Sequence, residues 1–157
     1  MSALPSRTFH ARRRSLQAAG ALVLAPKLPA HAAERNLADM PALSAFLAGR
    51  TPRWGRVRLE LPELADNGQA VPMKVVVAGP FAPGPHVRSI HLYSPVNPVP
   101  EIAVFEFPVA LERIEVESRI RLVDTQRVVA IAAMSDGVLY AAAAEVIVTI
   151  AGCMDGT

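Results

Sequence analysis

Residues 126–150 read QRVVAIAAMSDGVLYAAAAEVIVTI, and this segment has the clearest structural pattern in the chain. Two apolar runs flank the turn Ser135-Asp136-Gly137, and an Asp-Gly pair between such runs is typical of a tight hairpin connection. The second run ends in residues 146–150, whose valines and isoleucines indicate a buried strand. We therefore predict two long antiparallel strands near the C-terminus.

Upstream of this hairpin, further strand patterns recur at intervals of about ten residues. They cover residues 55–61, 73–79, 87–93, 101–107 and 112–122. Several alternate apolar with charged residues, as strands with one solvated face do. In residues 87–93 the alternation places Val87, Ser89, His91 and Tyr93 opposite Arg88, Ile90 and Leu92. No helical pattern separates these segments, which predicts an all-β antiparallel sandwich of about seven strands.

One short helix is expected before the strands, over residues 39–49. Asp39 suits the N-cap, and Gly49 suits the position after the last turn. One face of this helix is apolar and should pack on the sandwich; it holds Leu43, Phe46 and Leu47. Residues 50–55, RTPRWG, read as a turn-rich connector in which Trp54 serves as a packed anchor.

The first 32 residues have the features of an export signal. A basic start precedes an apolar run over residues 16–25, and a small-x-small site occupies residues 30–32. The pair Arg13-Arg14 resembles a twin-arginine signal, and the apolar run is too short to stay as a membrane anchor. We predict a signal peptide over residues 1–32, the helix and connector over 33–54, the β-sandwich over 55–150 and a C-terminal arm over 151–157.

Removal of the signal changes the net charge. Of the 16 basic residues, five precede the expected cleavage site, whereas all 14 acidic residues follow it, which leaves a net charge of −3. The basic character of the full chain therefore gives no reason to expect nucleic acid or anionic lipid as a partner. The single cysteine of the chain excludes an internal disulfide in an oxidising compartment.

Few residues outside the tail have the pattern of a catalytic or metal site. His86 and His91 are the histidines of the exported part, and we interpret both as ordinary surface residues rather than metal ligands. Glu112, Glu115 and Glu117 alternate along one strand, which is typical of a solvated face. The sequence has no phosphate-binding glycine loop and no nucleophile elbow.

The lone cysteine, Cys153, lies in the tail AGCMDGT, directly after the predicted last strand. Small and polar residues of this kind cannot build a core, so we expect an accessible thiol on a flexible arm. From Ala151 to Cys153 such an arm extends on the order of 10 Å. A catalytic Cys-His pair is disfavoured, because a catalytic thiol must be held rigidly beside its base. The patterns for lipid attachment at Cys153 also fail.

Several phrases of the sequence together resemble one protein family. They are LELPELADNGQAVPMKVVV, SIHLYSPVNPVP, SRIRLVDTQRVVAIAAMSDG and VIVTIAGCMDG, and the similarity runs over about residues 57–156. The resemblance is to SoxY, the cysteine-bearing subunit of the SoxYZ carrier of bacterial sulfur oxidation. It implies an immunoglobulin-like sandwich in the periplasm, paired with a SoxZ-like subunit and free of any cofactor of its own.

The same resemblance implies that Cys153 holds thiosulfate-derived sulfur covalently while haem-containing and hydrolytic Sox-type enzymes act on it. The usual tail of that family is Gly-Gly-Cys-Gly-Gly. Here Ala151 replaces the first glycine, Gly152 is kept, Met154 and Asp155 replace the two glycines after the cysteine, and Gly156 follows them. This departure leaves open whether the chain is the main thiosulfate carrier or a divergent paralogue.

Two other functions stay open. The first is an exported immunoglobulin-like interaction module whose tail thiol is incidental, and the second is an independent thiol enzyme, which is the weakest of the three. For binding of a partner subunit, the strand edges and the apolar helix around Leu43 and Phe46 are the surfaces that the sequence offers.

Overall fold

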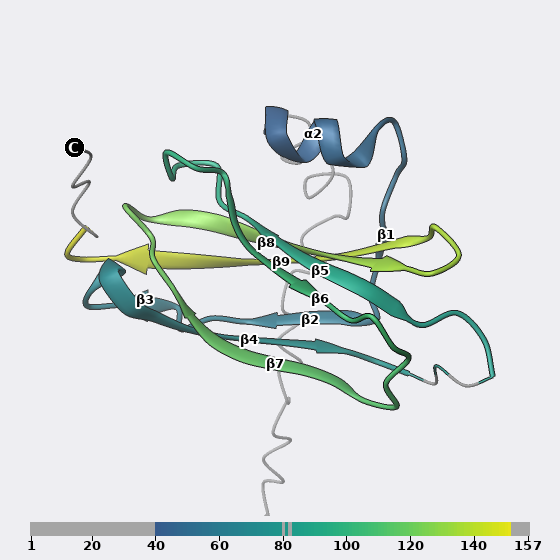
Figure 1. Cartoon of the computed structure of the whole chain (residues 1–157). Helices are drawn as coiled ribbons and strands as arrows, with labels where there is room; N and C mark the ends of the chain where they lie inside the picture. The colour runs from purple at the N-terminus through teal and green to yellow at the C-terminus, as the bar shows by residue number, and fades with distance from the viewer. Residues whose placement is uncertain (1–39, 80, 82, 152–157) are drawn as a thin grey trace, which may run out of the picture.

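The structure, a computed structural model, describes residues 40–79, 81 and 83–151, which form two β-sheets packed face to face (Figure 1). The larger sheet has the strand order β1-β9-β8-β5-β6, with β3 also paired to β9, and the smaller has the order β2-β4-β7. The larger sheet contains Arg53–Trp54 (β1), Leu64–Ala65 (β3), Val87–Tyr93 (β5), Glu101–Glu106 (β6), Gln126–Met134 (β8) and Leu139–Val148 (β9). The smaller sheet contains Val57–Glu60 (β2), Val71–Val77 (β4) and Ile114–Ile120 (β7).

The predicted fold class is confirmed: the protein is an immunoglobulin-like β-sandwich with a short helix before it. Among the described residues, the strands of four residues or more are β2 and β4 to β9, and all pairs among them are antiparallel. The hairpin of β8 and β9 forms as predicted. At its turn the Gly137 N–H donates to the Met134 carbonyl over 3.0 Å, and Gly137 has φ 85°.

Two short strands were missed. β1 lies in the expected connector, β3 lies between the strands predicted at 55–61 and 73–79, and each pairs in parallel with β9. The expectation of a purely antiparallel sandwich is therefore wrong at these two places. A two-residue strand has no alternation to read, so only the fold brings β1 and β3 beside β9.

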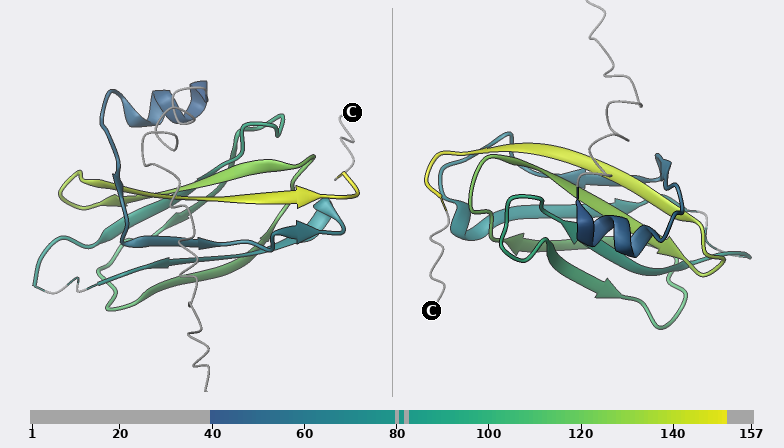
Figure 2. Two further views of the ribbon diagram at one scale, coloured as in Figure 1. Left: turned by 180° about the vertical axis from the view of Figure 1, so that it is seen from behind. Right: turned by 90° about the horizontal axis from the view of Figure 1, so that it is seen from above.

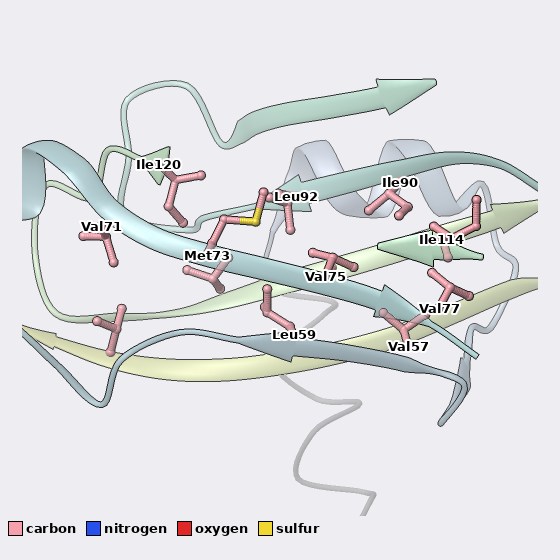
Figure 3. Close-up of a cluster of buried hydrophobic side chains, with 14 of the residues drawn as sticks. Val57, Leu59, Val71, Met73, Val75, Val77, Ile90, Leu92, Ile114 and Ile120 are labelled. Atoms are coloured by element: carbon pink, nitrogen blue, oxygen red, sulfur yellow. The ribbon is translucent and has the colours of Figure 1, made fainter. Parts of the chain in front are cut away.

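The core lies between the two sheets (Figure 3). Alternate residues of β2 and β4 point inward, and Figure 3 shows their side chains facing Ile90 and Leu92 of β5. The fully or nearly buried members from these two strands are Val57, Leu59, Val71, Met73, Val75 and Val77. The alternation predicted for the strand at residues 55–61 is thus confirmed over β2.

In β5 the predicted alternation is wrong at its start. Val87 is buried in the same core as Ile90 and Leu92, instead of sharing a face with Ser89 and His91. The register of β5 with β8 shifts between Val87 and Ser89. A bulge of this kind inserts one residue into the ladder and moves the preceding side chain to the other face, which a strict period of two does not anticipate.

The helix, α2, spans Pro41–Leu47 and lies on the outer face of the larger sheet (Figure 2). Leu43 and Leu47 are buried there in a second cluster with Tyr93, Val129 and Ile131. The packing of this apolar face is confirmed. Because Leu43 is fully buried against the sheet, its own side chain is not exposed for a partner subunit.

The ends of α2 differ from the prediction. The N-cap position is Met40, without a side-chain cap, and the expected cap Asp39 lies outside the described residues. The helix ends at Ala48, which adopts φ 48°, one residue before the expected Gly49. The predicted signal peptide also lies outside the described residues. Within the described part of the chain, no helix is both long and apolar enough to cross a bilayer.

The two ends of the sandwich are used below as landmarks (Figures 1 and 2). The hairpin end contains the turn between β8 and β9 and loop 107–113. The arm end is where β9 finishes, and it contains the segment 61–70, loop 94–100 and loop 121–125.

Candidate functional site at the root of the C-terminal arm

The predicted site residues fall into two groups. Cys153 and its neighbours Gly152, Met154, Asp155 and Gly156 lie outside the described residues. Ala151 is described and exposed. The described part of the site is therefore the arm root, which we define as residues 146–151, the end of β9 and the start of the arm.

Residues 63–68, which are distant in the sequence and include β3, form a clamp of hydrogen bonds along the outer edge of the arm root. The Ile147 N–H donates to the Glu63 carbonyl over 2.9 Å, and the Thr149 N–H donates to the Ala65 carbonyl over 3.0 Å. The Gly68 N–H then donates to the Ile150 carbonyl over 2.9 Å. Backbone hydrogen bonds thus hold the strand beyond the last residue of β9.

Side-chain hydroxyls complete this clamp. The Thr149 Oγ1 donates to the Asp66 carbonyl over 3.0 Å, and the Thr125 Oγ1 accepts the Val148 N–H over 2.9 Å. Val148 itself is buried in the core. The arm root is therefore bonded on both edges and packed from below up to Val148, and the Ile150 carbonyl is its last bonded backbone group in the described residues.

A buried glutamine links the loops around the arm root. The Gln126 Oε1 accepts hydrogen bonds from the Ser94 hydroxyl and, over 3.3 Å, from the Val96 N–H. Its Nε2 donates over 3.1 Å to the Asn97 Oδ1 and over 3.1 Å to the Asp124 carbonyl. Since Gln126 is only 7% exposed, these bonds satisfy its buried amide and join loop 94–100 to loop 121–125.

The clamp fixes the point from which the chain continues toward Cys153. The sandwich holds the chain firmly as far as Ile150, and Cys153 follows three residues later. Three residues span at most about 11 Å when extended. A thiol at Cys153 is therefore tethered within that distance of a fixed point, which suits the covalent presentation of a group to another protein.

His91, which we interpreted as an ordinary surface residue, has specific partners on the outer face of the larger sheet. Its Nδ1 lies 2.8 Å from the Glu101 Oε1, and its Nε2 lies 2.9 Å from the Ser89 Oγ. The Phe46 ring of α2 lies over the imidazole, with the centroids 4.2 Å apart, and the Tyr93 hydroxyl donates to the Glu101 Oε1 over 2.7 Å. This group joins α2 to β5 and β6.

The ionisation of this group follows from its contacts. Partial burial opposes the charged form of Glu101, but hydrogen bonds from His91 and Tyr93 outweigh burial and leave the pKa of Glu101 below its ordinary value. Burial, together with the hydrogen bond to Glu101, raises the pKa of Tyr93 well above its ordinary value. Glu101 is thus an ionised acceptor at neutral pH, and Tyr93 is a permanent donor.

The other residues considered from the sequence have structural roles. Glu115 and Glu117 both pair with Lys74 on the solvated face of the smaller sheet. Trp54 is half-buried and packs against the cluster beneath α2, as expected for an anchor. Over residues 40–79, 81 and 83–151, no three His, Cys, Asp or Glu side chains are grouped so that they could hold a metal ion.

The fold defines the class of protein: the described residues form an immunoglobulin-like β-sandwich, and the sequence places its one cysteine five residues after the last strand. Comparison with known families identifies the member of that class. The family described as "Sulfur oxidation protein SoxY" matches residues 43–153, which is most of the chain. The chain belongs to the SoxY family.

A solved structure agrees with this assignment. The sulfur carrier protein SoxY from Chlorobium limicola f thiosulfatophilum is 28% identical, with a TM-score of 0.57, and the match covers 76% of this chain and 99% of that chain. The family match and this neighbour together support a role as a sulfur carrier in sulfur oxidation, rather than as an enzyme. No curated protein matches the sequence.

More distant likeness is found among superoxide reductases. The neelaredoxin from Ignicoccus hospitalis is 20% identical, with a TM-score of 0.47, and covers 60% of this chain and 80% of its own. The superoxide reductase from Nanoarchaeum equitans is 16% identical, with a TM-score of 0.49, and covers 61% of this chain and 100% of its own. Likeness at this level carries no information about the chemistry of this chain.

The residues that secure the arm root were missed from the sequence. Thr125 and Thr149 have no local pattern that marks them as clamps, because their partners are 23 and 84 residues away. The prediction that residues 146–150 form a buried strand is wrong for Ile147 and Ile150, which are 56% and 66% exposed. The sequence did contain a signal for the exposure of Ile147. It shares the solvated side of the last strand with Glu145 and Thr149, so the alternation alone indicates an exposed isoleucine.

Proposed function

We propose that this protein is the cysteine-bearing subunit of a periplasmic sulfur carrier, and that Cys153 binds thiosulfate-derived sulfur covalently. The observation that carries the proposal is the arm root: the chain is bonded to the sandwich up to Ile150, and the family match extends to Cys153 three residues later. A short tether on a rigid domain keeps the thiol near a defined surface and free of the core.

The chemistry can be written with its atoms and electrons balanced. The thiol and thiosulfate join as Cys153–S–S–SO3⁻, a new S–S bond, with release of one proton and two electrons. The electrons pass to a haem-containing partner enzyme, since the carrier itself has no electron acceptor in this scheme. Water then cleaves the terminal sulfonate as hydrogen sulfate at a hydrolytic partner, which leaves the persulfide Cys153–S–SH.

The proposal also includes export of the protein and its pairing with a second subunit. The protein is exported by the twin-arginine route, loses residues 1–32 and pairs with a SoxZ-like subunit. Met154 and Asp155 replace two glycines of the usual family tail, which makes the arm bulkier and more acidic. In this proposal Met154 and Asp155 determine which partner enzymes accept the arm. That choice decides whether the protein is the main thiosulfate carrier or a paralogue with its own set of enzymes.

The direct test is to incubate the carrier with thiosulfate and the haem-containing enzyme of the same organism, followed by mass analysis of the C-terminal peptide. We expect one thiosulfate group on Cys153 and none in a Cys153→Ser variant. A matched control moves the thiol to the hairpin end in a Cys153→Ser/Ala110→Cys double variant, where Ala110 is exposed. Loading of that displaced thiol at the normal rate, or no adduct on the unaltered protein, would contradict the proposal.

The alternative function, an interaction module with an incidental thiol, predicts a different result. In that case cells that carry the Cys153→Ser variant respire on reduced sulfur as fast as cells that carry the unaltered protein. Turnover of thiosulfate by the isolated protein would instead identify an independent thiol enzyme.

A further inference from the structure

We propose that the arm end of the sandwich is a docking surface for the enzymes that act on Cys153, and that it binds them through exposed apolar side chains surrounded by acidic residues. The inference rests on the proposed function and adds to it a surface and a kind of partner. The occupant is an enzyme surface with an apolar centre and a basic rim, next to a recessed site that receives the thiol.

The distribution of exposed apolar side chains supports this surface. In the part of the chain that the structure describes, most of the large hydrophobic residues that remain exposed lie at the arm end, on β3, on the arm root and on loop 94–100. They are Leu64 (54% exposed), Val96 (47%), Val99 (67%), Ile147 (56%) and Ile150 (66%). Grouped exposure of this kind marks interaction sites more often than scattered single residues do.

Two of these residues lie side by side. Leu64 and Ile147 are partners in the parallel ladder of β3 and β9, so both side chains leave the sheet on the same face. Ile147 is six residues before Cys153 in the sequence. An apolar pair thus sits directly beside the place where the arm begins.

The surface is held in a fixed shape. Val96 is positioned by the bond from its N–H to the buried Gln126, and the neighbouring Asn97 accepts a bond from the Val123 N–H over 3.2 Å. The Asn97 Nδ2 also donates to the Arg121 carbonyl over 2.8 Å. Because these bonds fix loop 94–100 before any partner binds, little ordering is needed on association.

The length of the tether requires a partner enzyme to approach this surface. The Ile150 carbonyl is bonded to Gly68, and Cys153 lies at most about 11 Å farther along the chain. An enzyme that receives the thiol in a recessed site must bring its own surface within that distance of the arm root. A permanently bound subunit on the same surface would block this approach, so we place such a subunit elsewhere on the sandwich.

Charges around the apolar residues define the rim. Glu63 and Asp66 flank Leu64, and Glu145 precedes Ile147 on the same exposed side of β9. Asp124 is exposed on loop 121–125, where Arg121 is also exposed. Arg127 is the register partner of Glu145 across β8 and β9, so the set holds four acidic and two basic side chains. This acidic excess favours a partner rim of lysine and arginine and an association rate that falls with salt.

The test compares charge insertions at the two ends of the sandwich. The variants Leu64→Glu and Ile147→Glu alter the arm end, and Val109→Glu and Leu111→Glu alter exposed residues at the hairpin end. Loading of Cys153 by the haem-containing enzyme is measured with thiosulfate at low carrier concentration. Alkylation of Cys153 by iodoacetamide is measured in parallel, because that reaction needs no docking.

We expect each arm-end variant to load about tenfold more slowly, as for an interface residue worth more than 1 kcal/mol, while the alkylation rate is unchanged. The hairpin-end variants should load at the normal rate. If a glutamate at either position unfolds the edge of the larger sheet, the milder variants Leu64→Ala and Ile147→Thr are used in its place. Normal loading of stable arm-end variants would overturn the docking assignment. Loss of SoxZ-like subunit binding by these variants would also overturn it, because the surface would then belong to that subunit. Absence of loading in the unaltered protein would overturn the carrier function itself.

Discussion

β9 has a two-residue parallel partner at each of its ends, and the two ends differ in what else covers them. At the hairpin end β1 pairs with Tyr140 and Ala141, and the neighbouring Leu139 is buried in the cluster beneath α2. At the arm end β3 pairs with Ile147 and Val148, the 3-10 helix η1 (Gly68–Ala70) bonds to the Ile150 carbonyl through the Gly68 N–H, and Ile147 is not part of the cluster beneath α2. The backbone is hydrogen-bonded at both ends.

This difference separates two ways to hold a strand. Apolar burial secures the hairpin end, where Leu139 is 2% exposed. At the arm end Val146 and Val148 are also buried on the inner face, but on the outer face Ile147 stays 56% exposed while its backbone is hydrogen-bonded. A strand end that is fixed through its backbone keeps its side chains available for another protein.

The largest expected effect comes from truncating one side chain at each end. Leu139→Ala should lower the free energy of unfolding by about 2 to 5 kcal/mol, because it removes a buried side chain and leaves a cavity. Ile147→Ala should change the free energy of unfolding by less than about 0.5 kcal/mol, as for most surface substitutions. Urea unfolding followed by tryptophan fluorescence measures both. Equal losses for the two variants would remove the contrast between the ends.

The next effect concerns the clamp. Thr125→Val keeps the shape of the side chain but leaves the Val148 N–H without its acceptor, which should cost about 1 to 2 kcal/mol. Amide exchange at Val148 and Thr149 should accelerate, while exchange at Leu139 changes only as far as global stability falls. Thr51→Val, at an exposed position before β1, is the matched control. Unchanged exchange at Val148 would show that the hydroxyl does not hold the arm root.

A smaller effect is expected from pH at the group that joins α2 to the larger sheet. The pKa of Glu101 is lower in the folded chain than its ordinary value of 4.5, so the folded state binds fewer protons as the carboxyl titrates. Its stabilisation is therefore fully present above pH 4.5 and is lost as the pH falls through the lowered pKa. Because the Glu101 side chain is 40% exposed, solvent screening limits the contribution to less than about 1 kcal/mol.

The measurement is a set of melting temperatures from pH 3 to pH 7 for the unaltered protein and for Glu101→Gln. The variant should be less stable at pH 7, and its difference from the unaltered protein should shrink in acid. Glu112→Gln, an exposed residue at the hairpin end, should show no such convergence. A constant difference across the whole range would mean that the charge of Glu101 has no part in holding the group.

The smallest effect is expected in the arm itself. Asp155→Gly removes a negative charge two residues from Cys153, which should favour the thiolate. For two charges about 6 Å apart in water the interaction is about 0.7 kcal/mol, or about a threefold change in the rate of alkylation near neutral pH. Met154→Gly should leave that rate unchanged. A slower reaction after Asp155→Gly would contradict the electrostatic account.

The long strands could be predicted because their residues repeat a simple pattern. In residues 126–150 the apolar runs and the Asp-Gly turn point to the same hairpin, and β8 and β9 form there. The apolar face of α2 was found in the same way. The position of Cys153 after the last strand also follows from the sequence, because nothing beyond Ile150 has the composition of a core.

Other features depend on residues that are distant in the sequence. β1 and β3 have no periodicity of their own, and the bulge at Val87 interrupts the period that defines β5. The burial of Gln126 has no local signal either, because its hydrogen-bond partners come from two loops. The burial of Leu43 depends on the sheet beneath it.

The sequence by itself determined that this chain is a β-sandwich with one thiol on a short tail, since strand patterns and composition are local properties. Only the tertiary structure decided how the arm root is held and what surrounds it. The hydrogen bonds of residues 63–68 and Thr125 to the arm root, and the exposure of Leu64 beside Ile147, arise where separate strands meet. Such contacts exist only after the two sheets have packed, because they join groups that no local pattern connects.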